Sequence, residues 1–199
     1  MPASLFIKRI QHVVGLSLDD RSALGSLRVV ERSLAHREPL WREGDQPRQC
    51  AVVLSGFLCR HKVAGDRDQI LSFCVPGDFP DLQTLHISTI DHSVLSIGVS
   101  RVGLISHDQI RGILAGSQTL TRLFWRETLL YSAIFREWVC NVAARDALSR
   151  VAHLICEMEV RLAIVGLVEN DSFNLPLPSM KLQAPAVFRQ YTSTALCRY

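Results

Sequence analysis

The sequence of 199 residues has no long hydrophobic run, although 48% of its residues are hydrophobic. No window reaches the roughly 18 uncharged apolar residues of a membrane span. Near the N-terminus, Lys8 and Arg9 follow a short apolar stretch, whereas a secretory signal has its basic residues first. We therefore expect no membrane contact, and a chain that buries one sizeable core with a small appendage.

Paired cysteine motifs are also lacking. The six cysteines show no C-x-x-C spacing, and most of them stand inside apolar segments. This pattern indicates reduced, buried thiols in a cytoplasmic protein rather than a disulfide framework. The cysteines are Cys50, Cys59, Cys74, Cys140, Cys156 and Cys197.

Strong charge and catalytic motifs are missing as well. The net charge is +3 and the pI is about 8.6, which is well short of a nucleic-acid-binding footprint by charge alone. No Ser-His-Asp set, phosphate loop or H-E-x-x-H helix occurs. We predict that the chain is not an enzyme and that it carries no metal or cofactor.

The first half of the chain consists of helical pieces within residues 5–35, followed by short strands separated by turns. With no β-α-β alternation, this order predicts an α+β fold, an antiparallel β-roll of the jelly-roll or double-stranded β-helix kind with flanking helices. The basic residues around one hairpin, Arg60, His61, Lys62 and Arg67, are interpreted as a solvated rim. The expected strands are residues 50–54, 57–63, 69–75, 94–99 and 101–105.

Helical signals dominate the second half. Ser106 and Gln109 form an S-x-x-Q capping box that opens a short helix. A long helix is predicted over 117–142, a hinge over 141–146, and a second helix that ends at Gly166.

The long helix has two adjacent apolar stripes, which require two packing partners. One stripe, with Leu120 and Leu123, is predicted to pack on the N-terminal half of the chain. The other steps by four and three residues, as in a heptad seam, and is predicted to pack on a second copy. A single wide core stripe in a monomer is the alternative. The predicted dimer interface consists of Phe124, Thr128, Tyr131, Phe135, Trp138 and Val142.

Four segments resemble the Crp/Fnr family of bacterial transcription regulators. Leu40–Asp45, Val52–Gly56 and Val75–Asp78 are similar to turns of the family's roll, and Arg145–Met158 is similar to the helix after its dimerisation helix. The resemblance covers roughly residues 10–178. It implies a cyclic-nucleotide-binding-like roll (1–115), a dimerisation helix (116–143) and a C-terminal helix-turn-helix unit (144–199). It further implies a homodimer, DNA as a partner and a small-molecule effector.

The predicted effector pocket departs from the family pattern. Members that bind cyclic AMP carry a Gly-Glu pair after Pro-Gly-Asp and an Arg-Ser/Thr-Ala run further on. Here Asp78 is followed by Phe-Pro-Asp-Leu, and Asp91-His92-Ser93 replaces the arginine run. A carboxylate in place of the guanidinium repels a phosphate by about 4 kcal/mol at 4 Å and an effective dielectric near 20. Cyclic-nucleotide binding is therefore not expected.

A different effector pocket remains open as a hypothesis, with solvated loop residues as the alternative. A four-iron cluster is excluded because no cysteine precedes Cys50, and haem has no supporting pattern. The pocket candidates are Asp81, His86, Asp91, His92 and Ser93.

The C-terminus departs from the family after about residue 178. Pro185 stands where the first helix of the DNA-reading unit should continue, and residues 186–199 contain neither a turn glycine nor an amphipathic recognition helix. A frameshift near codon 180 is one explanation, because the shifted frame permits a Gly-Leu-Ser turn followed by Asn-Arg; a genuine variant is the other. The resemblance thus implies a transcription regulator with impaired DNA binding, or alternatively a module that acts only through dimerisation, including with an intact relative.

Overall fold

The computed structural model describes residues 4–11, 15–170 and 172–174. The predicted disruption after residue 178 lies outside these residues and stays a prediction. The elements are α1 (Ser4–Gln11), α2 (Leu18–Gly25), β1 (Val30–Leu34), β2 (Pro39–Trp41), β3 (Gln49–Ala64), β4 (Arg67–Cys74), the 3-10 turn η1 (Leu82–Leu85), β5 (Ser93–Ser106), α3 (His107–Gly116), α4 (Gln118–Ala144) and α5 (Ala147–Ile164).

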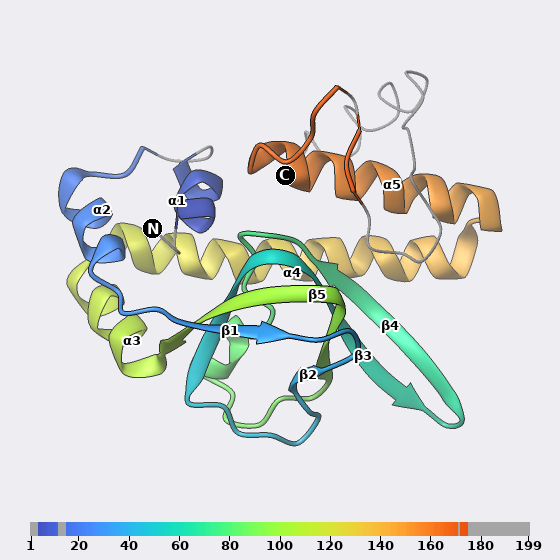
Figure 1. The fold of residues 1–199 in the computed structure, drawn as a ribbon, viewed down its shortest axis with the longest axis horizontal. Helices are drawn as coiled ribbons and strands as arrows, with labels where there is room; N and C mark the ends of the chain where they lie inside the picture. Colours follow the sequence, from blue (N-terminus) through green and yellow to red (C-terminus); the bar gives the residue numbers. More distant parts are fainter. Residues whose placement is uncertain (1–3, 12–14, 171, 175–199) are drawn as a thin grey trace.

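The five strands form one antiparallel sheet that curls into a roll (Figure 1). Their order is β1-β5-β3-β4, and β2 also pairs with β5. Along the central pair, Cys50 lies opposite Ile105 and Val53 opposite Val102. The predicted α+β class with an antiparallel roll and flanking helices is confirmed.

The long strands β3 and β5 are continuous, whereas the sequence predicted a break at Ser55-Gly56 in one and at Ser100 in the other. The glycine bends the strand instead of ending it: Gly56 has φ +76°, and the register of β3 against β5 shifts on either side of Ser55. A Cβ at Gly56 would lie 2.5 Å from the Val99 carbonyl oxygen, so only glycine fits at this crossing.

The helical prediction for residues 5–35 is wrong for its last part. Helix α2 begins after Ser17, whose hydroxyl accepts the Asp20 amide at 3.0 Å, and it ends at Gly25. Val30–Leu34 is strand β1, paired with β5. A free edge of β5 offers these residues a full ladder of hydrogen bonds, which outweighs their weak helical pattern.

The caps predicted for the C-terminal helices are present. Ser106 caps α3, and Gly166 has φ +76° just after α5. The break between α4 and α5 falls at Arg145 and Asp146, and Asp146 caps α5 by accepting the Ser149 amide at 2.8 Å. Figure 1 shows α4 and α5 running side by side in opposite directions.

Three apolar clusters hold these layers together. One joins α1 and α2 to α3 and α4, with Phe6 in edge-to-face contact with Phe79 and Phe124. A second fills the roll interior around Leu58 and Val94. The third places α5 on the outer face of the roll. Together they position α4 and α5 against the segment between β4 and β5.

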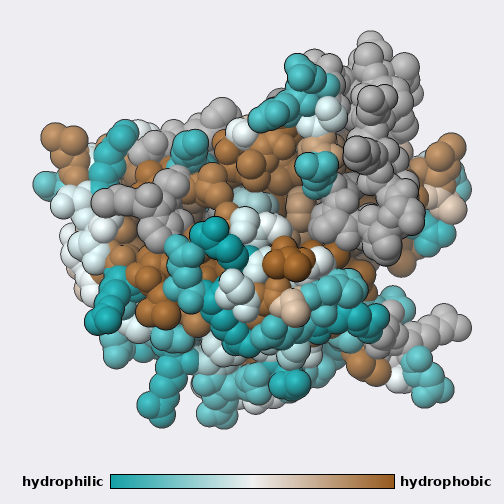
Figure 2. Space-filling view, in the orientation of Figure 1, coloured by the Kyte–Doolittle hydropathy of each residue, from teal (hydrophilic) through white to brown (hydrophobic). Residues whose placement is uncertain are grey.

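Surface polarity differs between these layers. Figure 2 shows mainly hydrophilic residues over the roll and hydrophobic residues gathered at the level of α4 and α5. Among the described residues, no helix is both long and apolar enough to cross a membrane.

The described cysteines are free thiols, and four of them are buried as predicted. Cys140 on α4 is the exception, because its side chain is exposed. Cys197 lies outside the described residues.

Candidate functional site

The segment that follows β4 is the part of the roll where the predicted effector residues stand. It opens with a turn at Pro76-Gly77-Asp78, in which Gly77 has φ +92°. The Asp78 carboxylate accepts the Val75 amide at 2.8 Å, so it closes the turn on itself. Asp78 is fully buried, and charged groups from two helices surround its carboxylate.

Asp81 lies inside the roll and is bound to the protein's own groups. Its carboxylate accepts the Ala51 amide at 3.0 Å and the Trp41 indole N–H at 2.5 Å. Burial raises the pKa of Asp81 to about 7, although both hydrogen bonds and the Arg60 charge oppose the rise. Because the Ala51 and Trp41 bonds occupy its oxygens, this carboxyl group acts as a link between β2, β3 and η1.

Arg60 and Tyr131 hold the residues between these two aspartates. Arg60 donates from Nε to the Pro80 carbonyl at 3.0 Å and from Nη2 to the Phe79 carbonyl at 3.3 Å. Its Nη1 donates to Ser72 Oγ at 3.1 Å. The guanidinium lies 4.8 Å from the centre of the Tyr131 ring, and the Tyr131 hydroxyl accepts the Phe79 amide. The interpretation of Arg60 as part of a solvated rim is therefore wrong.

Asp91, His92 and Ser93 stand at the start of β5, where the resemblance places the phosphate-binding run. His92 Nδ1 and the Asp91 carboxylate are 2.8 Å apart, and the Asp91 side chain is 82% exposed. Burial and then the Arg60 charge lower the pKa of His92, so the neutral ring donates to Asp91. Ser93 Oγ accepts the Glu43 amide at 3.1 Å. The exposed group at this position is thus an anion.

The nearest cation to Asp91 in these contacts is engaged elsewhere. Lys62 Nζ donates to the Asp91 backbone carbonyl at 2.8 Å and pairs with the Glu43 carboxylate at 2.9 Å. Its charge is therefore shared with a carboxylate rather than directed at an incoming phosphate.

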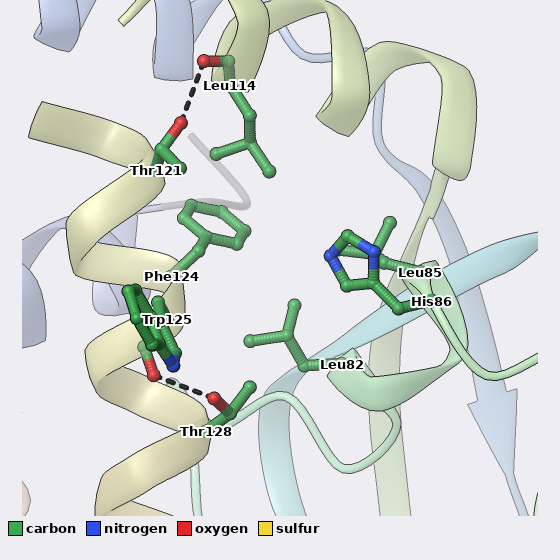
Figure 3. A pocket seen from close by; sticks show the side chains of 8 residues that line it. All are labelled: Leu82, Leu85, His86, Leu114, Thr121, Phe124, Trp125 and Thr128. Atoms are coloured by element: carbon green, nitrogen blue, oxygen red, sulfur yellow. Dashed lines mark hydrogen bonds between the residues drawn. The ribbon is translucent and has the colours of Figure 1, made fainter. Parts of the chain in front are cut away.

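His86 lies apart from the other candidates, at the rim of a hollow between η1 and α4 (Figure 3). The hollow measures about 320 Å³. Thr121 and Thr128 both donate their hydroxyls to backbone carbonyls, so the wall is almost wholly apolar. Its lining consists of Leu82, Leu85, His86, Leu114, Thr121, Phe124, Trp125 and Thr128.

The five predicted pocket residues therefore do not form one pocket. The structure brings Asp91 and His92 together, buries Asp81 in the roll, and leaves His86 exposed beyond η1. Ser93 serves the turn at Glu43. Among the described residues, no group of three or more His, Cys, Asp or Glu side chains is placed to hold a metal ion.

The predicted interface on α4 divides into two halves. Phe124 is 3% exposed and packs against Phe6 and Phe79 of its own chain, so its assignment to a dimer interface is wrong. Tyr131 and Trp138, one and two heptads further on, also contact their own chain, through Phe79 and Glu157.

The rest of the predicted seam, Phe135 and Val142, lies further along the same side of α4. Phe135 and Val142 are exposed, as are their apolar neighbours Trp125, Leu129 and Val139. A line of exposed residues, with Thr128 half-buried, steps by three and four positions along Trp125, Thr128, Ser132, Phe135, Val139 and Val142. This line shares three positions with the predicted seam. Trp125, Ser132 and Val139 replace Phe124, Tyr131 and Trp138, because those three side chains pack on their own chain.

Sequence reasoning missed the charged residues that surround this segment, chiefly Arg9, Asp78 and Arg161. Nothing local marks Arg9 or Arg161 as buried, since each stands among ordinary helix residues. Arg60 did carry a signal: strand alternation puts it on the same face as Leu58, and that face is the roll interior.

Comparison with known proteins agrees with this geometry. Residues 31–117 match the cyclic nucleotide-binding domain family. No curated protein matches the sequence.

Solved structures with the same fold include FixK2 from Bradyrhizobium japonicum, with a TM-score of 0.66 and 22% identity over 76% of this chain and 73% of that one. A cyclic nucleotide-binding domain from Methylobacillus flagellatus gives 0.56 and 16% identity, covering 68% and 79% of the two chains. The catabolite activator protein of Thermus thermophilus gives 0.52 and 16% identity, covering 79% and 80%. At these identities the likeness establishes the fold alone, an antiparallel roll with flanking helices of the cyclic nucleotide-binding-like kind.

Proposed function

We propose that the chain is a sensor of the Crp/Fnr regulator type that responds to an effector other than cyclic AMP. The observation that carries the proposal is the exposed Asp91 carboxylate where the resemblance expects a phosphate-binding arginine. Support also comes from the roll segment 78–81, whose polar groups already bind Arg60, Tyr131, Trp41 and Ala51.

Electrostatics oppose a cyclic phosphate at this place. Partial burial by itself would raise the pKa of Asp91, but the hydrogen bond and charge of His92 lower it, so the carboxylate is ionised at neutral pH. An anionic ligand would meet this negative charge, with Lys62 already paired to Glu43.

Isothermal titration calorimetry of the full chain with cyclic AMP and cyclic GMP tests this proposal. We expect no saturable heat up to millimolar nucleotide. A dissociation constant below about 100 µM, equivalent to more than about 5.5 kcal/mol of binding energy, would contradict it.

We further propose that the chain works as a homodimer through α4. The exposed apolar line from Trp125 to Val142 supports this, because a large apolar stripe that a single chain leaves exposed marks a surface for a partner. The hollow beside η1 shares Trp125 and Thr128 with this line, so a second copy would also close its open side.

DNA binding by this chain is proposed to be impaired, which favours an alternative role as a non-DNA-binding module that forms mixed dimers with an intact relative. The support is the sequence after residue 178, with Pro185 where a helix is required. A gel-shift assay with palindromic operators should show no sequence-specific complex. A tight complex that weakens with salt would contradict the impairment, and purification of mixed dimers would favour the alternative.

A further inference from the structure

Asp78 lies at the centre of a buried row of alternating charges that joins four parts of the fold. Arg9 of α1 and Arg161 of α5 both form ion pairs with its carboxylate. Each arginine has a second carboxylate: Arg9 pairs with a glutamate of α4 at 2.9 Å, and Arg161 pairs with a glutamate of α5 at 2.5 Å. We call this row the ion chain; its members are Glu127, Arg9, Asp78, Arg161 and Glu157.

All five members are at least nine-tenths buried. Two neutral groups extend the row: the Trp138 indole of α4 donates to Glu157 at 2.7 Å, and the Phe73 carbonyl accepts from Arg161 at 3.0 Å. Charges removed from water depend on their partners, so the loss of one member leaves another buried and unpaired. The ion chain is therefore sensitive to small changes in the position of Asp78.

The turn that carries Asp78 also lies close to the two helices that supply the arginines of the ion chain. A Cβ at Gly77 would lie 3.3 Å from the Leu5 carbonyl oxygen of α1 and 3.3 Å from Val165, just past α5. The turn thus has little room to shift without moving these helix ends.

Apolar contacts alone would hold α5 less specifically. Ile155, Met158 and Leu162 pack on the outer face of the roll, against residues such as Phe73 and Val75. Such packing is nondirectional, whereas the Asp78–Arg161 pair has one geometry.

We propose that the ion chain couples the turn at Asp78 to the position of α5, so that a displacement of residues 76–81 releases this helix from the roll. The inference rests on the proposed function, because an effector bound to the roll would cause that displacement. Helix α5 lies at the start of the segment 144–199, in which the resemblance places the DNA-binding unit, and so the ion chain supplies a physical route from the sensor to that segment.

Hydrogen–deuterium exchange of the full chain without any effector tests the coupling. Asp78→Asn removes the central charge, and Asp81→Asn is the matched control, since Asp81 is equally buried in the same segment but binds only Trp41 and Ala51. We expect Asp78→Asn to raise exchange in α1 and α5 about tenfold or more, as for loss of charge-assisted hydrogen bonds, and to leave β3 and β5 protected. Asp81→Asn should leave α5 within about threefold of the unaltered chain.

Unchanged exchange in α5 after Asp78→Asn, or an equal rise with Asp81→Asn, overturns the proposal. If Asp78→Asn does not fold, Glu157→Gln at the far end of the ion chain must give the same pattern in weaker form, and its absence there also overturns the coupling. The exchange experiment contains no ligand, so its failure contradicts only the coupling through the ion chain. The proposed function would instead be contradicted by cyclic-nucleotide binding in the calorimetric titration.

Discussion

Single residues decide what the segment after β4 can bind. Asp78 and Asp81 stand three positions apart and are both fully buried, yet they serve different partners. Asp78 pairs with arginines of two helices, whereas Asp81 accepts hydrogen bonds from neutral groups of the roll. Guanidinium groups in direct contact stabilise the charged form of a carboxylate, whereas at Asp81 the two neutral hydrogen bonds and the Arg60 charge offset only part of the cost of burial.

The stability of the protein should therefore depend on the ionisation of Asp81. Burial raises its pKa to about 7 from an ordinary value of 3.8, so between these values the folded state holds a proton that the unfolded state has lost. The free energy of unfolding then falls as pH rises through this window, by up to about 1.4 kcal/mol per pH unit. Asp81→Asn cannot ionise, so relative to the unaltered chain its stability should increase from pH 4.5 to pH 8.

Urea unfolding of both proteins across this pH range measures the effect. Other titrating groups, such as His92 and His107, are common to both proteins and cancel in the difference. Two parallel stability profiles would show that Asp81 keeps its ordinary pKa in the folded state.

At the scale of elements, the shape of the roll depends on the point where β3 bends and its register against β5 shifts. Gly56 at that point and Gly65 in the β3–β4 hairpin both have positive φ, but only Gly56 is crowded by backbone atoms. Substitutions at these two glycines therefore distinguish the cost of a positive φ from the cost of steric crowding.

Gly65→Ala should cost about 1–2 kcal/mol of unfolding free energy, the cost of a side chain in the left-handed region. Gly56→Ala adds a Cβ 2.5 Å from the Val99 carbonyl oxygen and 2.8 Å from Ser100 Cα, so we expect a loss of about 3 kcal/mol or more. Thermal and denaturant unfolding of the two variants measure the difference. Equal losses of unfolding free energy in the two variants would mean that β5 moves away from the added Cβ at position 56 without cost.

The whole molecule is organised around α4, whose two faces have different surroundings. Its inner face contacts the N-terminal helices and the roll through Leu120, Phe124 and Tyr131. Its outer face is apolar and exposed in the single chain. Assembly of two chains is the arrangement that would bury the second face.

Phe135→Glu and Val139→Glu should therefore weaken self-association by about 100-fold or more, because each buries a charge in the proposed interface. Leu18→Glu is the control: this residue of α2 is 84% exposed and lies outside the α4 line. Phe124→Leu should lower the unfolding free energy and leave association intact, since its ring lies in the core of its own chain. Sedimentation velocity and denaturant unfolding distinguish these outcomes, and a monomeric unaltered chain would refute the interface.

Much of the architecture was determined by local sequence patterns. Strand alternation, the Ser106 and Gly166 helix caps and the unbroken apolar pattern of α4 each depend on residues close together in the chain, so the roll and the long helices could be predicted. The replacement of the phosphate-binding arginine by Asp91 could also be recognised in the sequence, because it replaces one charge by its opposite.

Only the tertiary structure decided which face of α4 is buried and which charges meet. A heptad pattern fixes the spacing of a stripe but not its partner, and Phe124 drops out of the exposed line because Phe6 packs on its ring. Arg9, Asp78 and Arg161 are separated by 69 and 83 positions in sequence, so no local pattern could bring them together. Their pairing is a property of the folded chain, because burial in a common interior is what makes charges so distant in sequence depend on one another.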